Sequence, residues 1–383
     1  MNIFIVSRGY PERHDPQWGI FEALQADALR RLGHKVTILA VDSRLRFYPR
    51  KIGVRHLMAA NTYIYHLFPF RLIGFSKNLT RRTGQWMLRR LFRYVASREG
   101  MPDVVYAHYL NNMLHSLPLR NEFGGVLVGI EHWSEMMKEV ISPDIEACAR
   151  EVYPKLDSLL TVSGQLQEAI LKRFGTQAET VPNMVSEDFI SAPRRLRRGG
   201  RFEFSSVGRL VDWKHFDMVI RAAATLRDRG YDFGVTIIGG GEEEQNLRQL
   251  IERLDIGSHV KLAGVLTRDR IIDIHAHSDA FVLPSDHETF GVAIIEAMAM
   301  GLPVIACNAG GPIEIVDDSN GILIPPLDQN ALVDAMARMI DDSRRYDSER
   351  IAADCARKYA PQNVARRIED IFARTIRRKK EKL

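Results

Sequence analysis

The chain has 383 residues, of which 45% are hydrophobic and 26% charged, and its formal net charge is +5. These values are ordinary for a globular protein and exclude a disordered, collagen-like or disulfide-rich chain. The length predicts two or three domains, and no apolar run approaches the ~18 residues that a membrane-spanning helix needs. Residues 1–7 predict a first strand, with neither the basic segment nor the cleavage site of a signal peptide.

The first half of the chain alternates apolar, β-rich runs with helical patterns. Helices are predicted at 18–33, 77–98 and 164–174. This alternation predicts a parallel sheet with helices on both faces. The predicted strands are 2–7, 35–41, 62–69, 103–109, 125–132, 157–163 and 178–184.

The positive charge is concentrated in residues 43–98, which hold thirteen Lys or Arg and no acid. An anionic membrane surface is a candidate partner, because a basic amphipathic helix can lie among lipid headgroups. The alternative is a solvated basic face over an ordinary core helix. Nucleic acid is not expected, since no recognised binding module surrounds the stretch. On the helix at 77–98, one apolar side is predicted to hold Leu79, Trp86, Leu88, Leu91, Phe92 and Val95.

Residues 191–200 contain Pro193 and a Gly pair without apolar periodicity, which predicts a linker. The strand–helix alternation then restarts, so the sequence predicts two domains, 1–190 and 201–360. A final helix begins at Pro361, and its basic end is expected to fray. In the second domain, strands are predicted at 202–208, 233–239, 259–264, 280–284, 303–307 and 321–324, and helices at 215–229, 243–254, 268–277, 290–300, 329–341 and 344–358.

Three cysteines, Cys148, Cys307 and Cys355, lie far apart and show no metal-ligand spacing. Buried free thiols are the simplest explanation for them. An odd, dispersed set of thiols is typical of a reducing compartment, so a cytoplasmic location is predicted.

Two motifs follow strands of the second domain, where ligands of doubly wound sheets bind. Gly208 permits a close turn after strand 202–208, and Arg209 and Lys214 follow it. Two cations near a helix N-terminus suit a diphosphate, the alternative being two unrelated surface cations. The glycines 239–241 after the next strand predict the close approach of a ligand. They form neither a Walker loop nor a dinucleotide fingerprint.

A third motif runs from Pro284 to Ala306. Glu288 falls in a loop and can accept hydrogen bonds from sugar hydroxyls, whereas Glu296 lies on the next helix and can bind both hydroxyls of a ribose. The free amides at the start of that helix can bind phosphate or sugar oxygens. They belong to Thr289, Phe290, Gly291 and Val292.

Together these motifs resemble the retaining glycosyltransferases of family 4, which have the GT-B fold. The resemblance implies two Rossmann-like, doubly wound parallel-sheet domains facing across a cleft, with the C-terminal helix 361–383 crossing back to the first domain. It rests on Gly208-Arg209-Leu210 with Lys214, on Glu288 and Glu296 with seven residues between them, and on the runs Gly301-Leu302-Pro303-Val304-Ile305 and Gly310-Gly311-Pro312-Ile313-Glu314.

The resemblance implies that residues 201–360 hold a nucleotide-diphospho-sugar, UDP- or GDP-linked. Arg209 and Lys214 would neutralise the diphosphate and stabilise the leaving group. Glu288 would bind the donor sugar and Glu296 the ribose. The family needs no metal and no cofactor, and the sequence has no Asp-x-Asp motif. The base would meet the backbone of Val265 and Leu266.

The same resemblance assigns the acceptor to residues 1–190. Gly19 lies in a loop where many members have paired glycines near the donor phosphate. His132 matches a histidine that contacts the donor sugar or the reacting centre, and His108 is a second candidate at a strand end. Candidates for stacking on an acceptor sugar are Trp133, Trp18 and His14.

The predicted function is thus a retaining, metal-independent glycosyltransferase that acts on a lipid-linked or polysaccharide acceptor in cell-surface glycan synthesis, peripheral at the inner membrane face. A nucleotide-sugar epimerase is disfavoured by the four polar donor residues, and so is a nucleotide-sugar-binding scaffold without activity. A soluble storage-sugar transferase is disfavoured by the acid-free basic stretch. A Rossmann dehydrogenase lacks its fingerprint here.

Overall fold

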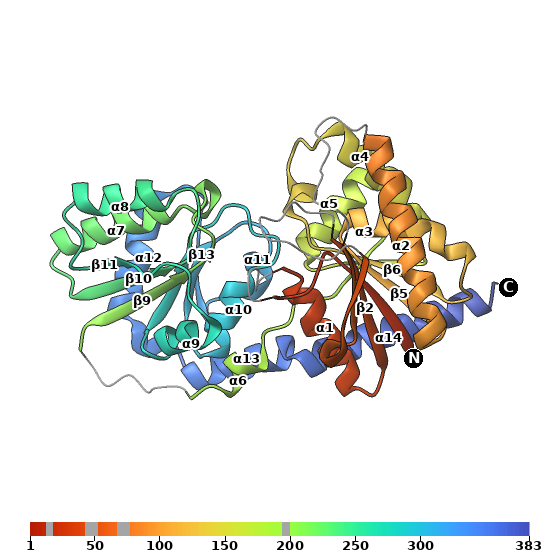
Figure 1. The fold of residues 1–383 in the computed structure, drawn as a ribbon. Helices are drawn as coiled ribbons and strands as arrows, with labels where there is room; N and C mark the ends of the chain where they lie inside the picture. The colour runs from red at the N-terminus through yellow and green to blue at the C-terminus, as the bar shows by residue number, and fades with distance from the viewer. Residues whose placement is uncertain (13–17, 43–52, 67–76, 194–199, 383) are drawn as a thin grey trace. The chain divides into compact units, whose positions relative to one another are not determined.

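The structure, a computed structural model, describes residues 1–12, 18–42, 53–66, 77–193 and 200–382. The chain divides into two compact units, which are drawn in Figure 1. Unit 1 comprises Met1–Met184 and Pro361–Leu383, and unit 2 comprises Val185–Ala360. Each unit holds one sheet with helices on both faces, so the predicted class of two doubly wound α/β domains is confirmed. Residues 194–199 of the predicted linker lie outside the described residues.

Unit 1 is built on an eight-stranded sheet with the order β3-β4-β2-β1-β5-β6-β7-β8. All described pairs are parallel except β3 with β4, an antiparallel edge pair that the sequence did not predict. Its strands are β1 Asn2–Ser7, β2 Lys35–Asp42, β3 Gly53–Leu57, β4 Thr62–His66, β5 Val104–His108, β6 Val126–Glu131, β7 Ser158–Thr161 and β8 Glu179–Thr180.

Helices cover both faces of this sheet. Helix α1 packs on α14, whereas α2 packs on α3 and α3 on α4. The sequence missed α3 and α4, whose patterns are short. The helices of unit 1 are α1 Ile20–Arg31, α2 Lys77–Glu99, α3 Leu110–Ser116, α4 Pro143–Val152, α5 Gly164–Phe174 and α14 Pro361–Lys380.

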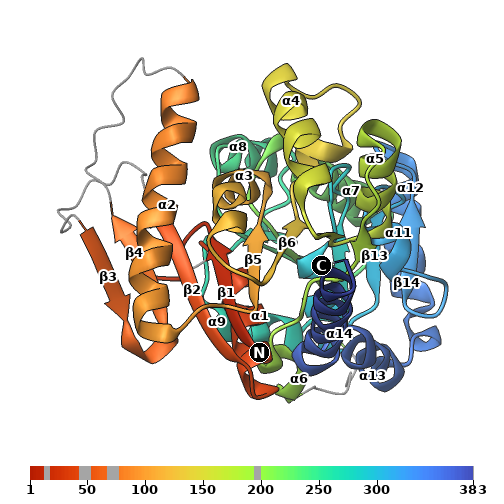
Figure 2. The same cartoon turned by 90° about the vertical axis from the view of Figure 1, so that its right-hand side faces the viewer.

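Helix α2 buries its apolar side in unit 1. Leu88, Leu91, Phe92 and Val95 are buried, because the helix packs on α3, β2 and β4 (Figure 2). The prediction that Trp86 shares this side is wrong, since its ring is 53% exposed on the opposite face. The buried apolar side therefore serves the protein core and is not free to enter a lipid layer. The side chain of Leu79 lies outside the described residues.

Several arginines of α2 form ion pairs with acidic residues from outside the acid-free stretch 43–98. Arg81 forms a bidentate ion pair with Glu151 of α4, with nitrogen–oxygen distances of 2.7 and 2.5 Å. Arg89 and Arg93 both pair with Glu122, which follows α3 in the chain. Three arginines of α2 are thus paired with acids that are distant in sequence. The part of 43–98 that falls in 43–52 and 67–76 lies outside the described residues.

Unit 2 is built on a six-stranded parallel sheet with the order β11-β10-β9-β12-β13-β14. Helices α7, α8 and α12 pack together, and Figure 1 shows α7 and α8 on one face with α9 and α10 on the other. The strands are β9 Phe202–Val207, β10 Phe233–Ile238, β11 Val260–Leu262, β12 Ala280–Leu283, β13 Val304–Cys307 and β14 Gly321–Ile324. The helices are α6 Glu187–Ser191, α7 Phe216–Asp228, α8 Glu244–Arg253, α9 Arg268–Ala276, α10 Val292–Ala299, α11 Pro312–Ile315, α12 Gln329–Asp341 and α13 Ser348–Tyr359.

Helix α14 returns the chain to unit 1 and remains helical as far as Lys380. The expectation that its basic end frays is wrong, because those cations are used. Arg374 lies 2.7 Å from a carboxylate oxygen of Glu179, and Lys379 lies 3.6 Å from Asp157. Across the described ranges, no helix is long and apolar enough to cross a membrane.

Candidate active site

Two loops at the carboxyl end of the unit 2 sheet carry three of the charged residues predicted to bind the donor. Strand β9 neighbours both β10 and β12, so the loops that follow these strands lie side by side. Arg209 and Lys214 follow β9, whereas Glu288 follows β12. The structure brings together Lys214 and Glu288, which are 74 positions apart in the chain.

Lys214 and Glu288 form a direct ion pair between Nζ and Oε2. The two side chains are only 15% and 17% exposed, so the pair is largely shielded from water. Arg209 differs, because its side chain is 69% exposed and lies 3.2 Å from Glu242. An anion approaching these loops meets one exposed cation and one shielded cation, each paired with a carboxylate.

The loops after β9 and β12 are joined by two further contacts. The hydroxyl of Ser285 donates to the carbonyl of Trp213 at 3.1 Å. Nε2 of His215 lies 3.1 Å from Oδ2 of Asp286. Nδ1 of His287 lies 2.6 Å from the other carboxylate oxygen of Asp286, Oδ1. Three successive residues, 213–215, are thereby fastened to the loop that carries Glu288.

The glycines after β10 serve backbone packing. A Cβ on Gly239, whose φ is +148°, would lie 1.8 Å from the carbonyl oxygen of Gly208. A Cβ on Gly241 would lie 2.2 Å from the carbonyl oxygen of Leu210. The amide of Leu210 donates a hydrogen bond to the carbonyl of Gly240. The close approach predicted for a ligand is therefore taken at these two positions by the neighbouring loop.

A second glycine contact shapes the loop of Glu288. A Cβ on Gly311 would lie 2.3 Å from the backbone of Phe290, and the amide of Gly311 donates to the carbonyl of Glu288 at 2.9 Å. Gly291 caps α10 with a φ of +104°, a conformation that favours glycine. Thr289 to Val292 thus form the tight entry to α10, as the sequence predicts.

Glu296 lies in the middle of α10, eight residues after Glu288, and is partly exposed. Burial raises the pKa of Glu296 to about 7, and the guanidinium of Arg268 opposes that rise. Val265 and Leu266 follow β11, and the side chain of Val265 is mostly exposed beside Gly240.

In unit 1, two histidines occupy the carboxyl ends of neighbouring strands. Nδ1 of His108 lies 3.1 Å from Nε2 of His132, and the rings are nearly parallel, at 15°. Burial lowers the pKa of His108 to about 3 and that of His132 well below its usual value. Both rings are therefore neutral at physiological pH.

Glu131 anchors the backbone beneath His132. Its Oε1 accepts hydrogen bonds from the amides of His132 and Trp133 at 3.0 and 3.1 Å. Its Oε2 accepts from the hydroxyl of Tyr153 at 3.0 Å. Burial raises the pKa of Glu131 to about 7.

Arg8, directly after β1, is held by aromatic rings and one acid. Its guanidinium lies 3.8 Å from the ring centroid of Tyr109 and 3.3 Å from Glu22. The indole of Trp18 donates to the carbonyl of Arg8 at 2.7 Å. A Cβ on Gly19 would lie 2.4 Å from the carbonyl oxygen of Gly9, so this glycine permits backbone contact. His14 lies outside the described residues.

Two family models match almost the whole chain. One, described as "Glycosyltransferase Family 4", matches residues 24–189, and the other, described as "Glycosyl transferases group 1", matches residues 190–358. The chain belongs to the family 4 glycosyltransferases. It is a glycosyltransferase that uses a nucleotide sugar, as the sequence predicts. The family matches disfavour the epimerase and the inactive scaffold.

Individual relatives of this glycosyltransferase are distant. It is 25% identical to the alpha-D-kanosaminyltransferase of Streptomyces kanamyceticus over 75% of this chain and 80% of that protein. It is 26% identical to a glycogen synthase of Mycobacterium tuberculosis over 89% of this chain and 86% of that protein. Sucrose-phosphate synthase from Thermosynechococcus elongatus superposes with a TM-score of 0.76 at 18% identity, covering 98% of this chain and 99% of that one. This likeness confirms the GT-B fold.

Sequence reasoning missed several residues of this glycosyltransferase site. His215 follows Lys214, Glu131 precedes His132, and Asp286 lies two residues before Glu288, and this proximity in sequence was the available signal. The contacts of His215 with Asp286 and of Glu131 with Tyr153 were not readable, because each joins residues that are distant in sequence. Among the described residues, no group of three or more His, Cys, Asp or Glu is placed to hold a metal ion.

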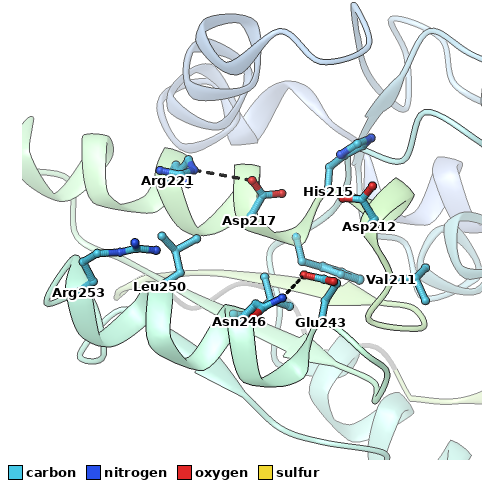
Figure 3. A pocket seen from close by; sticks show the side chains of 11 residues that line it. Val211, Asp212, His215, Asp217, Arg221, Glu243, Asn246, Leu250 and Arg253 are labelled. Atoms are coloured by element: carbon cyan, nitrogen blue, oxygen red, sulfur yellow. Dashed lines mark hydrogen bonds and ion pairs between the residues drawn. The ribbon is translucent and has the colours of Figure 1, made fainter.

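A cavity of about 260 Å³ lies beside the loop after β9, between the first part of α7 and the length of α8 (Figure 3). Asp212 and His215 line it, whereas Arg209, Lys214 and Glu288 do not. Among its other polar groups, Arg221 pairs with Asp217 at 3.7 Å and Asn246 with Glu243 at 2.9 Å. The cavity is therefore separate from the donor residues.

Proposed function

We propose that this glycosyltransferase is retaining and metal-independent and takes a UDP- or GDP-sugar. The observation that supports this is the shielded Lys214–Glu288 pair, with Arg209 exposed on the same loop. Two cations at one sheet edge can balance a diphosphate without a metal ion, and they stabilise the charge that develops on the leaving group.

In the proposed complex, Lys214 forms an ion pair with the diphosphate, and its ion pair with Glu288 is broken. The carboxylate is then free to accept hydrogen bonds from donor-sugar hydroxyls, so the pair converts from an internal contact into two substrate contacts. The entry to α10 offers the amides of Thr289 to Val292 to the same ligand. Glu296 would bind the ribose, and the backbone of Val265 and Leu266 the base.

In unit 1, His132 would contact the donor sugar or the reacting centre, and Gly19 would shape the neighbouring loop. The proposed acceptor is lipid-linked or polysaccharide, and the proposed location is cytoplasmic, peripheral at the inner membrane face. The exposed side of α2, with Arg82, Trp86 and Arg90, is the described part of 43–98 that remains for an anionic surface.

The test is turnover of a panel of UDP-, GDP- and ADP-sugars in the presence of EDTA. Nucleotide release is measured with a cell lipid extract and, in a second arm, with glucan oligosaccharides. Release with lipid extract and EDTA supports the proposal, and an α-configured product from an α-configured donor supports retention. Release only with the glucans selects storage-sugar synthesis, and loss of release with EDTA contradicts metal independence.

A further inference from the structure

Three neighbouring strands of the unit 1 sheet each end next to a residue of one stacked row. Arg8 follows β1, Tyr109 follows β5 and His132 follows β6, and these strands are adjacent in the order β1-β5-β6. The guanidinium carbon of Arg8 lies 3.8 Å from the ring centroid of Tyr109, whose ring stacks on that of His132 at 4.8 Å. The row therefore places a cation, which the sequence motifs did not predict, at the carboxyl end of the sheet.

The backbone of Tyr109 is strained where it holds its ring in this row. Its φ of +69° and ψ of +148° fall in a region that residues with side chains rarely adopt. Its amide donates to the carbonyl of Ile130 at 2.9 Å, and its carbonyl accepts from the amides of Asn112 and Met113 in α3. Such strain persists only where neighbouring contacts fix it, and it is concentrated at ligand sites.

A buried carboxylate also fixes the Arg8 guanidinium. Oε1 of Glu22 accepts from both the backbone amide and Nε–H of Arg8, each at 3.3 Å. The Glu22 side chain is fully buried, whereas the Arg8 side chain is 28% exposed. The cation is therefore the partner of this pair that a solute can reach.

The contacts that hold Arg8 leave hydrogen-bond donors at the end of its side chain. A guanidinium has five N–H donors in one plane, and Nε–H is the one that binds Glu22. The described contacts use this edge and the face on Tyr109, so N–H groups of the Nη atoms remain for a ligand. Their planar arrangement matches two oxygens of a phosphate group.

The surroundings of the guanidinium are aromatic and uncharged. Its carbon lies 5.0 Å from the ring centroid of Trp18, whose indole donates to the carbonyl of Arg8. A Cβ on Gly9 would lie 2.1 Å from the Trp18 ring, so this glycine lets the indole pack on the loop. Burial raises the pKa of Tyr109 above its usual value, so its phenol does not repel an anion. A low local dielectric strengthens a charged hydrogen bond.

We propose that Arg8 binds a phosphate group of the acceptor, with Tyr109 and Trp18 as the walls of this subsite. Unit 2 has its own cations for the donor diphosphate, Arg209 and Lys214, so a phosphate bound in unit 1 belongs to the other substrate. This inference rests on the proposed function and deepens it by naming the acceptor chemistry. The acceptor is a phosphate or diphosphate ester, as a lipid-linked acceptor is, and not an uncharged glucan.

The first experiment needs no turnover. Geranyl diphosphate is titrated by calorimetry into the full chain carrying Arg209→Ala and Lys214→Ala, so that the donor cations of unit 2 are absent. Adding Arg8→Met to this background should weaken binding by about 10-fold or more, as expected for a lost charge-assisted hydrogen bond. Absence of binding, equal affinity with and without Arg8, or equal binding of the uncharged alcohol geraniol would each overturn the proposal.

Two further variants separate binding from folding. Arg150→Met is the matched control, since Arg150 also pairs with an acid, Glu146, at 2.6 Å and lies 5.5 Å from the ring of Phe174. It should bind geranyl diphosphate as the background does, and equal weakening would contradict a specific site. If Arg8→Met lowers the melting temperature, Arg8→Met with Glu22→Gln removes the unpaired carboxylate and should fold yet bind weakly. Restored affinity in this double variant would contradict binding by Arg8.

A nucleotide arm distinguishes the acceptor from the donor as the source of the phosphate. UDP and GDP are titrated into the chain with Arg209 and Lys214 intact, and Arg8→Met should leave their affinity unchanged. A loss equal to that for geranyl diphosphate would give Arg8 to the donor and overturn the acceptor assignment. If neither nucleotide binds, the proposed function fails, whereas the phosphate site of unit 1 is still decided by the geranyl diphosphate titration.

Discussion

The two units place polar residues at the same end of similar parallel sheets, but they treat charge differently. In unit 2, Lys214 pairs with Glu288 in a largely shielded contact, and Arg209 pairs with Glu242 at the surface, all of them in loops. In unit 1, His108 and His132 are buried and neutral. At the carboxyl end of its sheet, unit 2 thus holds ion pairs, whereas unit 1 holds a hydrogen bond between neutral rings. Depth of burial makes the difference, since desolvation disfavours an ionised group.

The two units resemble each other in how glycines let neighbouring loops approach closely. Gly239 and Gly241 in unit 2 and Gly19 in unit 1 each permit contact between backbones of adjacent loops. In both units, the loops that carry site residues are therefore supported by neighbouring backbone. Changes in these supports should act on stability, whereas changes in the charged loop should act on turnover.

The largest expected effect tests the charged site of unit 2. Lys214→Ala should lower kcat/KM by ~10²- to 10³-fold, because it removes a cation that stabilises the leaving diphosphate. Steady-state nucleotide release measures it. Lys155→Ala, which removes an exposed lysine of unit 1 paired with Glu151, is the matched control. Wild-type kcat/KM in Lys214→Ala would remove this lysine from the mechanism.

The next effect tests glycine packing. Gly239→Ala should destabilise the protein by about 3 kcal/mol or more, because its Cβ meets a carbonyl oxygen and its backbone is strained. Gly230 is the control, since its φ is also positive, at +83°, and no atom lies within 4 Å of an added Cβ. Gly230→Ala should cost about 1 kcal/mol. Equal shifts of the urea midpoints would show that contact with the neighbouring loop is unimportant.

Glu131 provides a pH test of the buried site in unit 1. Its folded pKa of about 7 lies above the usual 4.5, so the folded chain holds a proton that the unfolded chain loses between these values. Stability from this group is therefore full below pH 4.5, falls as pH rises to 7, and is level above it. Glu131→Gln should change the free energy of unfolding relative to wild type by about 3 kcal/mol across that range.

Urea titrations at several pH values measure this difference. Glu146→Gln, on an exposed helical ion pair with Arg150, is the control. A difference between Glu131→Gln and wild type that stays constant from pH 4.5 to pH 7 would mean that Glu131 is ionised in the folded chain.

The smallest effect concerns the surface of α2. If anionic lipid binds there, Arg82→Ser with Arg90→Ser should weaken flotation with anionic liposomes by about 2 kcal/mol, since each cation near such a surface contributes about 1 kcal/mol. Arg229→Ser with Arg248→Ser, two paired arginines of unit 2, is the charge-matched control. Equal flotation of the three proteins would leave α2 with a purely structural role.

Much of the fold was readable because strand and helix periodicity are local. The strand 321–324 and the helix 329–341 were predicted to the residue. The edge strand β3 was missed because it is antiparallel and lies beside residues without clear periodicity. Helix α2 was located correctly, but the face on which Trp86 lies was not, since a helical pattern does not tell which side meets the core.

By itself, the sequence determined the two-unit α/β architecture, the family and the loops that carry Arg209, Lys214 and Glu288, because these depend on local patterns and spacings. Only the tertiary structure decided which groups pair. It joined Lys214 to Glu288, assigned the arginines of α2 to Glu122 and Glu151, and buried His108 against His132. The reason is physical, since ionisation and hydrogen bonding depend on distance and solvent exposure, which residues far apart in sequence settle only when the chain folds.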